Sequence, residues 1–482
     1  MQIFFLYLQN FFYGVMATEP NTVELEDIHD PNPPVGVENN NDEVLEIGQD
    51  GLPTSIGPEV EKHPELHPME QKEEEDITVN IKRVKTCGTI FNILDSLMGS
   101  GILAVPNSFT NIGIIPSFVI MAIIATLAWV AAVMVLYLLD ETNAKTFDQL
   151  AAIILGPIGS RILTILNLFF LICCLLGFLI LGGDMIVSWF KLGNINISSL
   201  GYRVIMMIVY AFCIPIALSI PKKITFLSYF AVGSVFCIFF FCGAVVGRGI
   251  EHIVKHGVSK SITLGVGGMG IFSSISIHGL AFALPLVFIP AMSIFYKPEV
   301  KAKATVSFYG QFICYLLVAI PGLFGYLQFG KDTAGNVLNS YPVNDILMVV
   351  VRSGFFIVVS CAYPMLAQSV MASWSFLVFK ESQHVKLPPL KLACVHCLTH
   401  LIPLIIAIFL AEVKPALLVG GALGGCLAQF TFPCWMWVKH SDKPVYHWVN
   451  ILCIVFGIFG IVTGVCATYQ AVVDAIAAFS KK

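Results

Sequence analysis

The sequence has few charged residues for its length. Asp, Glu, Lys and Arg together make up 12% of its 482 residues, whereas they make up about a quarter of a typical soluble domain. Hydrophobic residues make up 57%, and the mean hydropathy is +0.82. This shortage of charge excludes an ordinary water-soluble domain and predicts a polytopic membrane protein.

The sequence also lacks the motifs that enzymes and ATP-driven pumps use. It has no complete phosphate-binding loop ending in Gly-Lys-Ser or Gly-Lys-Thr, and no evident pairing of a nucleophile with a base. Cysteine is absent from the three long loops expected outside, residues 191–203, 248–268 and 330–345, so a structural disulfide is not expected there. We therefore expect neither an enzyme nor a catalytic residue, no cofactor, no metal and no nucleic-acid partner.

The charge that is present is divided by region. Residues 17–80 contain 18 acidic and two basic residues, whereas residues 81–482 contain 13 acidic and 25 basic residues. The acidic stretch is rich in Pro and Asn and poor in aromatics, so it cannot bury enough apolar surface to offset its chain entropy. We expect residues 1–80 to be a disordered acidic cytosolic tail, which either binds a cytosolic partner or is a solvated leader. Residues 1–16 are apolar but too short to span a bilayer, and they do not resemble a signal peptide.

Eleven apolar segments within residues 81–482 are long enough to span a bilayer as helices. They run roughly over residues 86–108, 113–139, 161–190, 203–220, 224–247, 269–295, 305–329, 345–373, 389–411, 415–438 and 447–475. One set of connections carries fifteen Lys and Arg, and the opposite set carries nine. Because basic residues gather on the cytoplasmic side, the N-terminus is predicted to be cytosolic.

The first apolar segment contains residues that are costly in lipid, within the stretch GTIFNILDSLMGSGILAVP at 88–106. Gly99 and Gly101 each lower helix propensity by about 1 kcal/mol relative to Ala, and Pro106 ends or bends a helix. A broken helix leaves free N–H groups on one half and free C=O groups on the other, which is tolerated only inside a protein-enclosed cavity. Those groups suit the carboxylate of an amino acid and a cation. The alternative is a close helix–helix packing site.

Asp95 lies one turn before Gly99 on the same face. A carboxylate at membrane depth is functional by default, and it can exchange a proton or hold a cation. The alternative is a neutral Asp that is hydrogen-bonded to a neighbouring helix. The sixth segment contains a matching interruption at Pro285 and Pro290, at the offset that an inverted repeat predicts. His278 precedes it, and we expect this residue to be a satisfied core histidine.

The stretch FNILDSLMGSGILAVP resembles the first helix of the amino acid/auxin permease family, and most closely that of the sodium-coupled neutral amino acid transporters. The stretches CYLLVAIPGLFGYLQFG at 314–330 and NDILMVVVRSGFFIVVSCAYPM at 344–365 are similar to the family in the same order. The resemblance covers roughly residues 82–475. It implies an all-α polytopic membrane protein of about eleven transmembrane helices, with a 5+5 inverted repeat in the first ten, which is the LeuT-like fold.

The resemblance also implies a site between the broken first and sixth helices. The positions that match the family's substrate-binding residues are Gly99, Ser100, Gly101, Phe282 and Ala283. The positions that match its ion-coupling residues are Asp95, Met98 and Ser360. Sodium-coupled members usually carry Asn at the position of Asp95 and Thr at that of Ala362, so the coupling ion, H⁺ or Na⁺, stays open.

The resemblance implies a secondary active transporter of neutral amino acids that works by alternating access and is driven by a proton or sodium gradient. Two alternatives stay open: a polyamine or auxin-like carrier, and an amino acid sensor that signals through the tail. We expect a monomer in the lipid bilayer of either the plasma membrane or the lysosomal or vacuolar membrane.

Three further polar features have ordinary structural interpretations. Asp184 is expected to face a loop, and Arg352 either snorkels to the interface or forms a gate or structural pair. The stretch CVHCLTH at 394–400 suggests a metal site, but its side chains do not all converge on one helix, so a metal is not expected.

Overall fold

The computed structural model describes residues 83–195, 200–221, 228–381, 384–410 and 412–480. The chain divides into a unit of residues 1–81 and a unit of residues 82–482, and the description below concerns the second. The predicted acidic tail and the apolar residues 1–16 lie outside the described residues. Their predicted disorder therefore stays a prediction.

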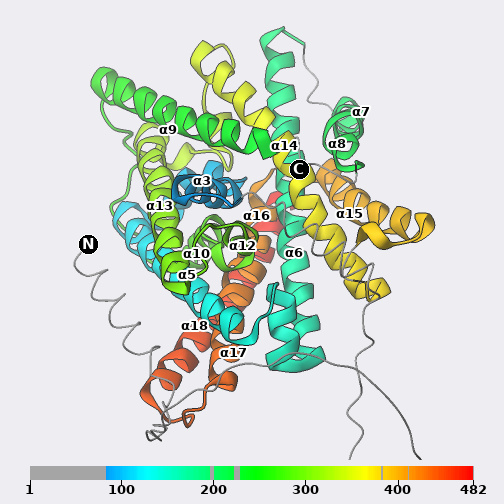
Figure 1. Cartoon of the computed structure of the whole chain (residues 1–482). Helices are drawn as coiled ribbons and strands as arrows, with labels where there is room; N and C mark the ends of the chain where they lie inside the picture. The colour runs from blue at the N-terminus through cyan, green and yellow to red at the C-terminus, as the bar shows by residue number, and fades with distance from the viewer. Residues whose placement is uncertain (1–82, 196–199, 222–227, 382–383, 411, 481–482) are drawn as a thin grey trace, which may run out of the picture. The chain divides into compact units, whose positions relative to one another are not determined.

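The described unit is built from helices, and its only strand-like feature is one isolated bridge (Figure 1). Ten described helices are long and apolar enough to cross a membrane, and the bent pair at the start of the unit is an eleventh. In chain order the spans are α3 (Thr86–Leu97) with α4 (Gly101–Ile112), α5 (Ile114–Thr142), α6 (Phe147–Leu192), α7 (Leu200–Ala211) with η1 (Phe212–Ile216) and α8 (Ala217–Ser219), α9 (Ser228–His256), α10 (Gly270–Ala281) with α11 (Leu284–Val287) and α12 (Ile289–Ser293), α13 (Val300–Phe329), α14 (Ile346–Trp374) with η5 (Ser375–Phe379), α15 (Pro389–Phe409), α16 (Lys414–Ala422) with η7 (Leu423–Thr431) and α17 (Phe432–His440), and α18 (Trp448–Ser480). The predicted all-α fold with eleven spans is confirmed.

Only one span begins far from its predicted start. The third was expected to begin at residue 161, but α6 begins at Phe147 and kinks at Gly156, which has a φ of 81°. The short helical stretch before this kink carries Asp148, so its composition did not suggest a continuous apolar segment. Its carboxylate accepts a 2.7 Å hydrogen bond from Thr164 beyond the kink, which fixes the bend.

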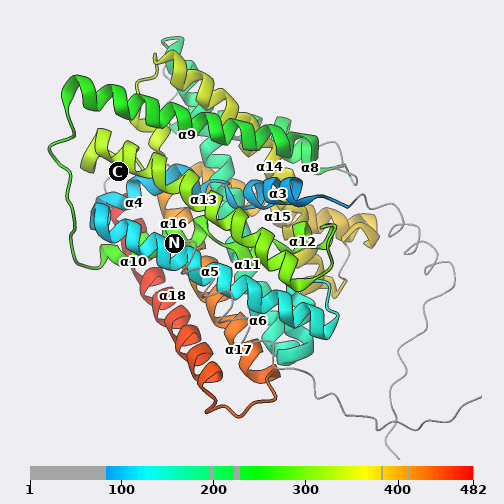
Figure 2. The same ribbon diagram turned by 60° about the vertical axis from the view of Figure 1, so that its left-hand side comes forward.

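Two spans form the interior of the unit and one lies at its edge (Figure 2). In the most apolar window of the α10–α12 span 78% of the residues are buried, and the same holds for the α16–α17 span, whereas the figure for α18 is 28%. The helix α10 packs against α4, α5, α16, η7 and α18. The sixth span is therefore enclosed by protein, and a break in it does not face lipid.

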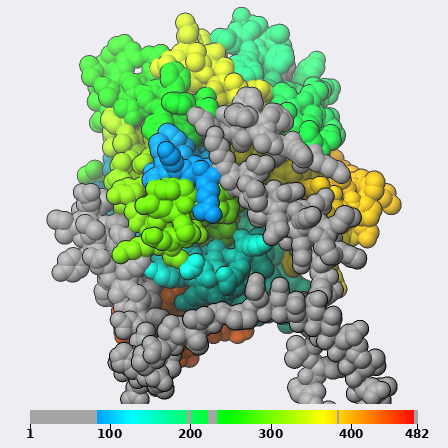
Figure 3. Space-filling view, viewed as in Figure 1, coloured from blue at the N-terminus to red at the C-terminus, as the bar shows by residue number. Residues whose placement is uncertain are grey.

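The first and sixth spans are tied together at both ends by backbone hydrogen bonds. On the side where the unit begins, here called the N-terminal side, Val84 N–H donates to Ile294 O at 2.9 Å and Tyr296 N–H donates to Val84 O at 3.1 Å. In the space-filling view, α3 (blue) lies beside the green segment around α12 on this face (Figure 3). On the opposite side, Ile114 N–H donates to Thr263 O at 3.1 Å and Val266 N–H donates to Ile112 O at 2.8 Å. These links hold the two broken spans in register.

Gly113 joins α4 to α5 at this opposite-side link, with a φ of 85° and a ψ of −177°. A methyl group on its Cα would lie 2.7 Å from Thr263 O. We predict that Gly113→Ala destabilises the protein by about 2 kcal/mol, because this backbone conformation is essentially restricted to glycine. The measurement is thermal denaturation in detergent. Gly243→Ala is the control, since Gly243 lies in α9 with open space around it, and it should not lower the melting temperature. Equal melting temperatures for Gly113→Ala and wild type would contradict the prediction.

Candidate functional site

The first span is broken at residues 98–100, as predicted, and its two halves meet at an angle of 60°. In an unbroken helix the Gly99 amide would donate to the Asp95 carbonyl, but here it donates to Leu97 O at 3.0 Å. The Asp95 carbonyl therefore lacks its usual helical donor, and the first amides of α4 lack helical acceptors. The break leaves main-chain acceptors at the end of α3 and donors at the start of α4.

The interruption of the sixth span was expected at Pro285 and Pro290, and the structure places it just before Pro285, at Phe282 and Ala283. Phe282 ends α10, with its amide donating to His278 O at 3.0 Å, and the Leu284 amide then turns back to Phe282 O at 2.7 Å. Both residues of the break are buried, and the Phe282 ring stacks on Tyr315 of α13 with 6.3 Å between centroids. The break precedes Pro285, which becomes the first-turn proline of α11.

The two breaks are neighbours in space. A methyl group on Gly101, the first residue of α4, would lie 3.2 Å from Ala281 Cα, the last residue of α10. Gly99 faces α6, where a methyl group on it would lie 3.0 Å from the Phe178 ring. The Ser100 side chain lies against Gly177 of α6 and is buried. The structure thus brings Gly99, Ser100 and Gly101 together with the end of α10, between α6 and the sixth span.

The tenth span packs closely against the second break because it carries glycines there. This role was not predicted from the sequence. A methyl group on Gly279 would lie 2.8 Å from Gly425 O, and one on Gly421 would overlap Ser276 O. The Gln429 amide also reaches Gly279 O at 3.5 Å, the carbonyl left free by the break. The signal was present as two Gly-Gly pairs four residues apart in GGALGGC, a spacing typical of close helix contacts. It could not show which helix was contacted.

Asp95 is half-buried near the end of α3, and no hydrogen bond or ion pair from another described residue reaches its carboxylate. The alternative of a neutral Asp bonded to a neighbouring helix therefore has no described partner to support it. The Asp95 carboxylate lies near Cys361 of α14. The Ser360 hydroxyl, the neighbour of Cys361, hydrogen-bonds the Tyr210 hydroxyl of α7 at 3.2 Å. Asp95 thus faces the region of α14 that carries Ser360, whose hydroxyl already has one partner. The ion-coupling role of this group, Met98 included, stays a prediction.

His278 lies one turn before the second break, and its side chain is fully buried. Neither ring nitrogen has a hydrogen-bond partner among the described residues. The expectation of a satisfied core histidine is therefore wrong. An unpaired polar group buried in a protein costs about 1–3 kcal/mol, and buried polar groups are usually paired, so we add His278 to the candidate site.

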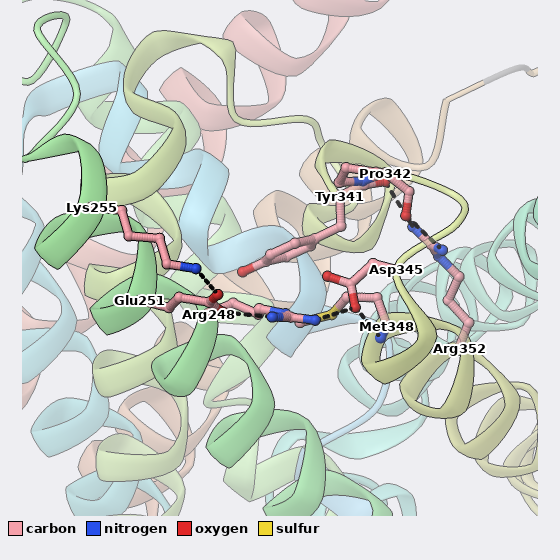
Figure 4. Close-up of polar contacts among 8 residues, drawn as sticks. All are labelled: Arg248, Glu251, Lys255, Tyr341, Pro342, Asp345, Met348 and Arg352. Atoms are coloured by element: carbon pink, nitrogen blue, oxygen red, sulfur yellow. Dashed lines mark hydrogen bonds and ion pairs between the residues drawn. The ribbon is translucent and has the colours of Figure 1, made fainter.

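Two charged side chains, one buried and one half-buried, have structural partners in the loop at residues 330–345. Arg352 is 2% exposed, and it donates to Tyr341 O at 2.8 Å (Figure 4). It also donates to Leu338 O at 2.8 Å, so it does not snorkel to the interface. Asp184 accepts a hydrogen bond from Asn339 at 2.8 Å, so it anchors the loop instead of simply facing it. These residues fix the loop that precedes α14.

A second ionic cluster connects α9 to the start of α14 (Figure 4). Arg248 lies 2.5 Å from Glu251 and 2.7 Å from Asp345, and Lys255 lies 2.6 Å from Glu251. The Asp345 carboxylate also caps α14 by accepting from the Met348 amide. These groups pair with one another at the surface, and they are not free to bind a substrate.

The segment CVHCLTH does not form a metal centre in the described part of the chain. Cys394 and Cys397 are exposed, whereas His400 is buried against α14. His396 Nδ1 lies 3.4 Å from His400 Nε2, so the two histidines contact each other and the two cysteines do not join them.

Comparison with protein families gives one match over most of the chain. The family described as "Transmembrane amino acid transporter protein" matches residues 82–470. Solute carrier family 38 member 10 from Homo sapiens is 22% identical over 379 residues, which cover 76% of this chain and 34% of that protein. Sodium-coupled neutral amino acid transporter 7 from Homo sapiens is 22% identical over 395 residues, which cover 78% and 85%. The chain thus spans about a third of the length of the first relative.

Among solved structures, the nucleobase–cation-symport-1 family transporter MHP1, in a closed conformation with bromovinylhydantoin bound, has a TM-score of 0.55. Its sequence is 12% identical, and the match covers 81% of this chain and 92% of that chain. At this identity the likeness concerns the fold alone. It supports the LeuT-like arrangement that the broken first and sixth spans predict.

Arg352 is the most enclosed of the described charged side chains. We predict that Arg352→Met destabilises the protein by about 3 kcal/mol, because the substitution leaves the buried carbonyls of Leu338 and Tyr341 without a donor. The measurement is the melting temperature in detergent. Arg161→Met removes an exposed arginine of α6 and should leave the melting temperature unchanged. A wild-type melting temperature for Arg352→Met would show that these hydrogen bonds contribute nothing.

Proposed function

Because the chain belongs to the transmembrane amino acid transporter family, the amino acid/auxin permease family, we propose that it is a secondary active transporter of neutral amino acids. The observation that carries the proposal is the adjacency of two helix breaks inside the protein, with Gly101 against Ala281. Free amides at the start of α4 suit the substrate carboxylate, since a helix N-terminus attracts anions. The free carbonyls at the end of α3 suit a cation. The relatives' names support the substrate class.

We assign the substrate to the space beside the two breaks, with Gly99, Ser100 and Gly101 at its carboxylate. Phe282 and Ala283 lie on the other side, and His278 offers the polar group that lacks a partner. No nucleotide or covalent intermediate is required, because an ion gradient supplies the free energy. The site between the two spans opens to one side of the membrane and then to the other, which is alternating access.

We propose the proton as the coupling ion, with Asp95 as its carrier. A carboxylate at membrane depth without a described cationic partner binds a proton readily, because the neutral form is easier to keep in a low dielectric. Sodium would need several oxygen ligands, and the Ser360 hydroxyl already has a partner in Tyr210. The bias of Lys and Arg supports an orientation in which the N-terminal side faces the cytosol. The membrane is the plasma membrane or a lysosomal or vacuolar membrane.

The decisive experiment is uptake of radiolabelled amino acids into proteoliposomes, across a panel of side chains. The external medium is either mildly acidic or neutral, and at each acidity it contains either sodium or choline. We predict that uptake responds to external acidity more than to sodium, and that Asp95→Asn blunts the response to acidity. Asp332→Asn is the control, since Asp332 is exposed in the loop after α13.

Uptake that requires sodium and ignores external acidity would refute proton coupling but not transport. Binding of an amino acid without flux would indicate a sensor, and flux of a polyamine with none of an amino acid would indicate the other carrier class. These outcomes separate the substrate class, the coupling ion and the transport activity itself.

The contact between the breaks gives a second prediction. Gly101→Val places two methyl groups against the backbone of Ala281 and pushes α4 away from α10, so we expect uptake to fall at least about tenfold, as small misplacements of a binding site do. Gly243→Val, on the lipid-facing surface of α9, is the matched control and should transport normally. Normal uptake by a correctly folded Gly101→Val protein would contradict the assignment of the site.

A further inference from the structure

A row of hydrogen-bonding side chains runs along α15 and α14 and takes no part in the site described above. His396 Nδ1 lies 3.4 Å from His400 Nε2, and His400 Nδ1 lies 3.1 Å from the Tyr363 hydroxyl. The three rings are stacked, with 5.6 Å between the centroids of the histidines and 5.8 Å between His400 and Tyr363. His400 and Tyr363 are 3% and 0% exposed. Buried polar groups in such a row are rare in a membrane protein unless they have a use.

His400 has the geometry of a proton relay. Each of its two ring nitrogens lies within hydrogen-bond distance of a different group, one toward each end of the row. An imidazole can accept a proton on one nitrogen and release a different proton from the other, and it does so near neutral pH. A histidine with only a structural role does not need a hydrogen-bond partner at both ring nitrogens.

The His396 end of the row lies on the N-terminal side. η6 (His384–Lys386) joins η5 to α15 there, and His384 is half-buried near His396. Burial lowers the pKa of His384, and the nearby His396 lowers it further. His384 is therefore neutral at neutral pH and can pass protons without holding a charge. A cluster of Met371, Leu387 and Val395, flanked by Trp374 and Leu392, surrounds this part of the row with apolar atoms.

The inner end of the row points toward the ion site. Tyr363 lies one turn after Ser360 on the same face of α14, and it lies near Tyr210 of α7. Tyr210 and Ser360 are hydrogen-bonded at 3.2 Å, and the next residue, Cys361, lies near the Asp95 carboxylate. The hydroxyls thus continue the row from the histidines to the only carboxylate in the first span.

We propose that His396, His400 and Tyr363 form a proton path between the N-terminal side of the membrane and the ion site at Asp95. The inference rests on the proposed function and assigns the route by which the coupling proton leaves. In each step one N–H or O–H bond breaks as another forms. A proton released by Asp95 enters the Tyr210–Ser360 pair, passes by way of the Tyr363 hydroxyl to His400 Nδ1, and a proton leaves His400 Nε2 for His396. No charge is left behind once His396 passes a proton to the medium beside His384.

Titratable groups come close to the row from three neighbouring elements. They are Tyr363 from α14, Tyr210 from α7 and His384 from η6, and the ammonium of Lys391 at the start of α15 lies over the Phe379 ring, 5.4 Å from its centroid.

The experiment uses the whole protein in proteoliposomes with an equimolar mixture of neutral L-amino acids. Proton movement that accompanies the substrate is followed with a pH-sensitive dye, and exchange is followed by counterflow of labelled substrate. His400→Phe keeps a stacked ring without its nitrogens, and Tyr363→Phe removes only a hydroxyl. We expect both variants to lose substrate-coupled proton movement at least about tenfold, as the loss of a proton-transfer group does. Counterflow should stay within about twofold of wild type, because exchange needs the loaded carrier to change sides but does not need the proton to leave.

The matched control is His256→Phe. The rings of His252 and His256 also lie next to each other, four residues apart at the C-terminal end of α9, with 5.0 Å between centroids. Among the described residues no tyrosine is hydrogen-bonded to this pair. This variant should match wild type in both assays.

Wild-type proton movement in both Tyr363→Phe and His400→Phe would overturn the path and leave the proposed function intact. Wild-type protein without counterflow or proton movement would overturn both. If His400→Phe also loses counterflow, Tyr363→Phe decides, because it removes one oxygen and leaves the packing: selective loss of proton movement supports the path, and no loss overturns it.

Discussion

The fold depends on one constraint, which is that lipid offers no hydrogen-bond partner to a broken backbone. Two spans are broken near each other, so protein must enclose both. Small residues make this possible: Gly101 lets α4 approach the end of α10, and Gly279 and Gly425 let the tenth span approach α10 from another side. Larger side chains at these positions would separate the helices and expose free amides and carbonyls. The site and its enclosure therefore have the same structural cause.

The buried polar groups fall into two classes that only the coordinates separate. Arg352 and Asp184 have carbonyl and amide partners in one loop, so they stabilise that loop. His278 and Asp95 have no hydrogen-bond partner among the described residues, although the fold encloses one and half-encloses the other. A polar group in membrane that the protein itself does not satisfy is costly. The second class lies at the two breaks, and this coincidence supports the binding site proposed there.

The sequence was sufficient for the features that depend on local chemistry. The break at Gly99–Gly101, the interruption of the sixth span and the number of spans all follow from short stretches of residues, and the structure confirms them. Contacts between distant segments could not be foreseen. Nothing in the sequence indicated that Ser360 hydrogen-bonds Tyr210, or that Tyr363 lies beside His400. Such pairings depend on how helices cross, and no periodicity within one helix encodes the crossing.

The two ends of the broken spans are held with unequal strength. On the N-terminal side, one bridge with two backbone hydrogen bonds joins Val84 to the end of the sixth span, and the Arg83 guanidinium adds a long contact of 3.5 Å. On the opposite side, three backbone hydrogen bonds join the α4–α5 turn to residues 263–266, and Gly113 fits there without space for a side chain. Because each hydrogen bond must be replaced when the spans separate, separation costs less on the N-terminal side. That is also the side to which the row of histidines leads, so the proposed exit for the proton and the weaker closure coincide.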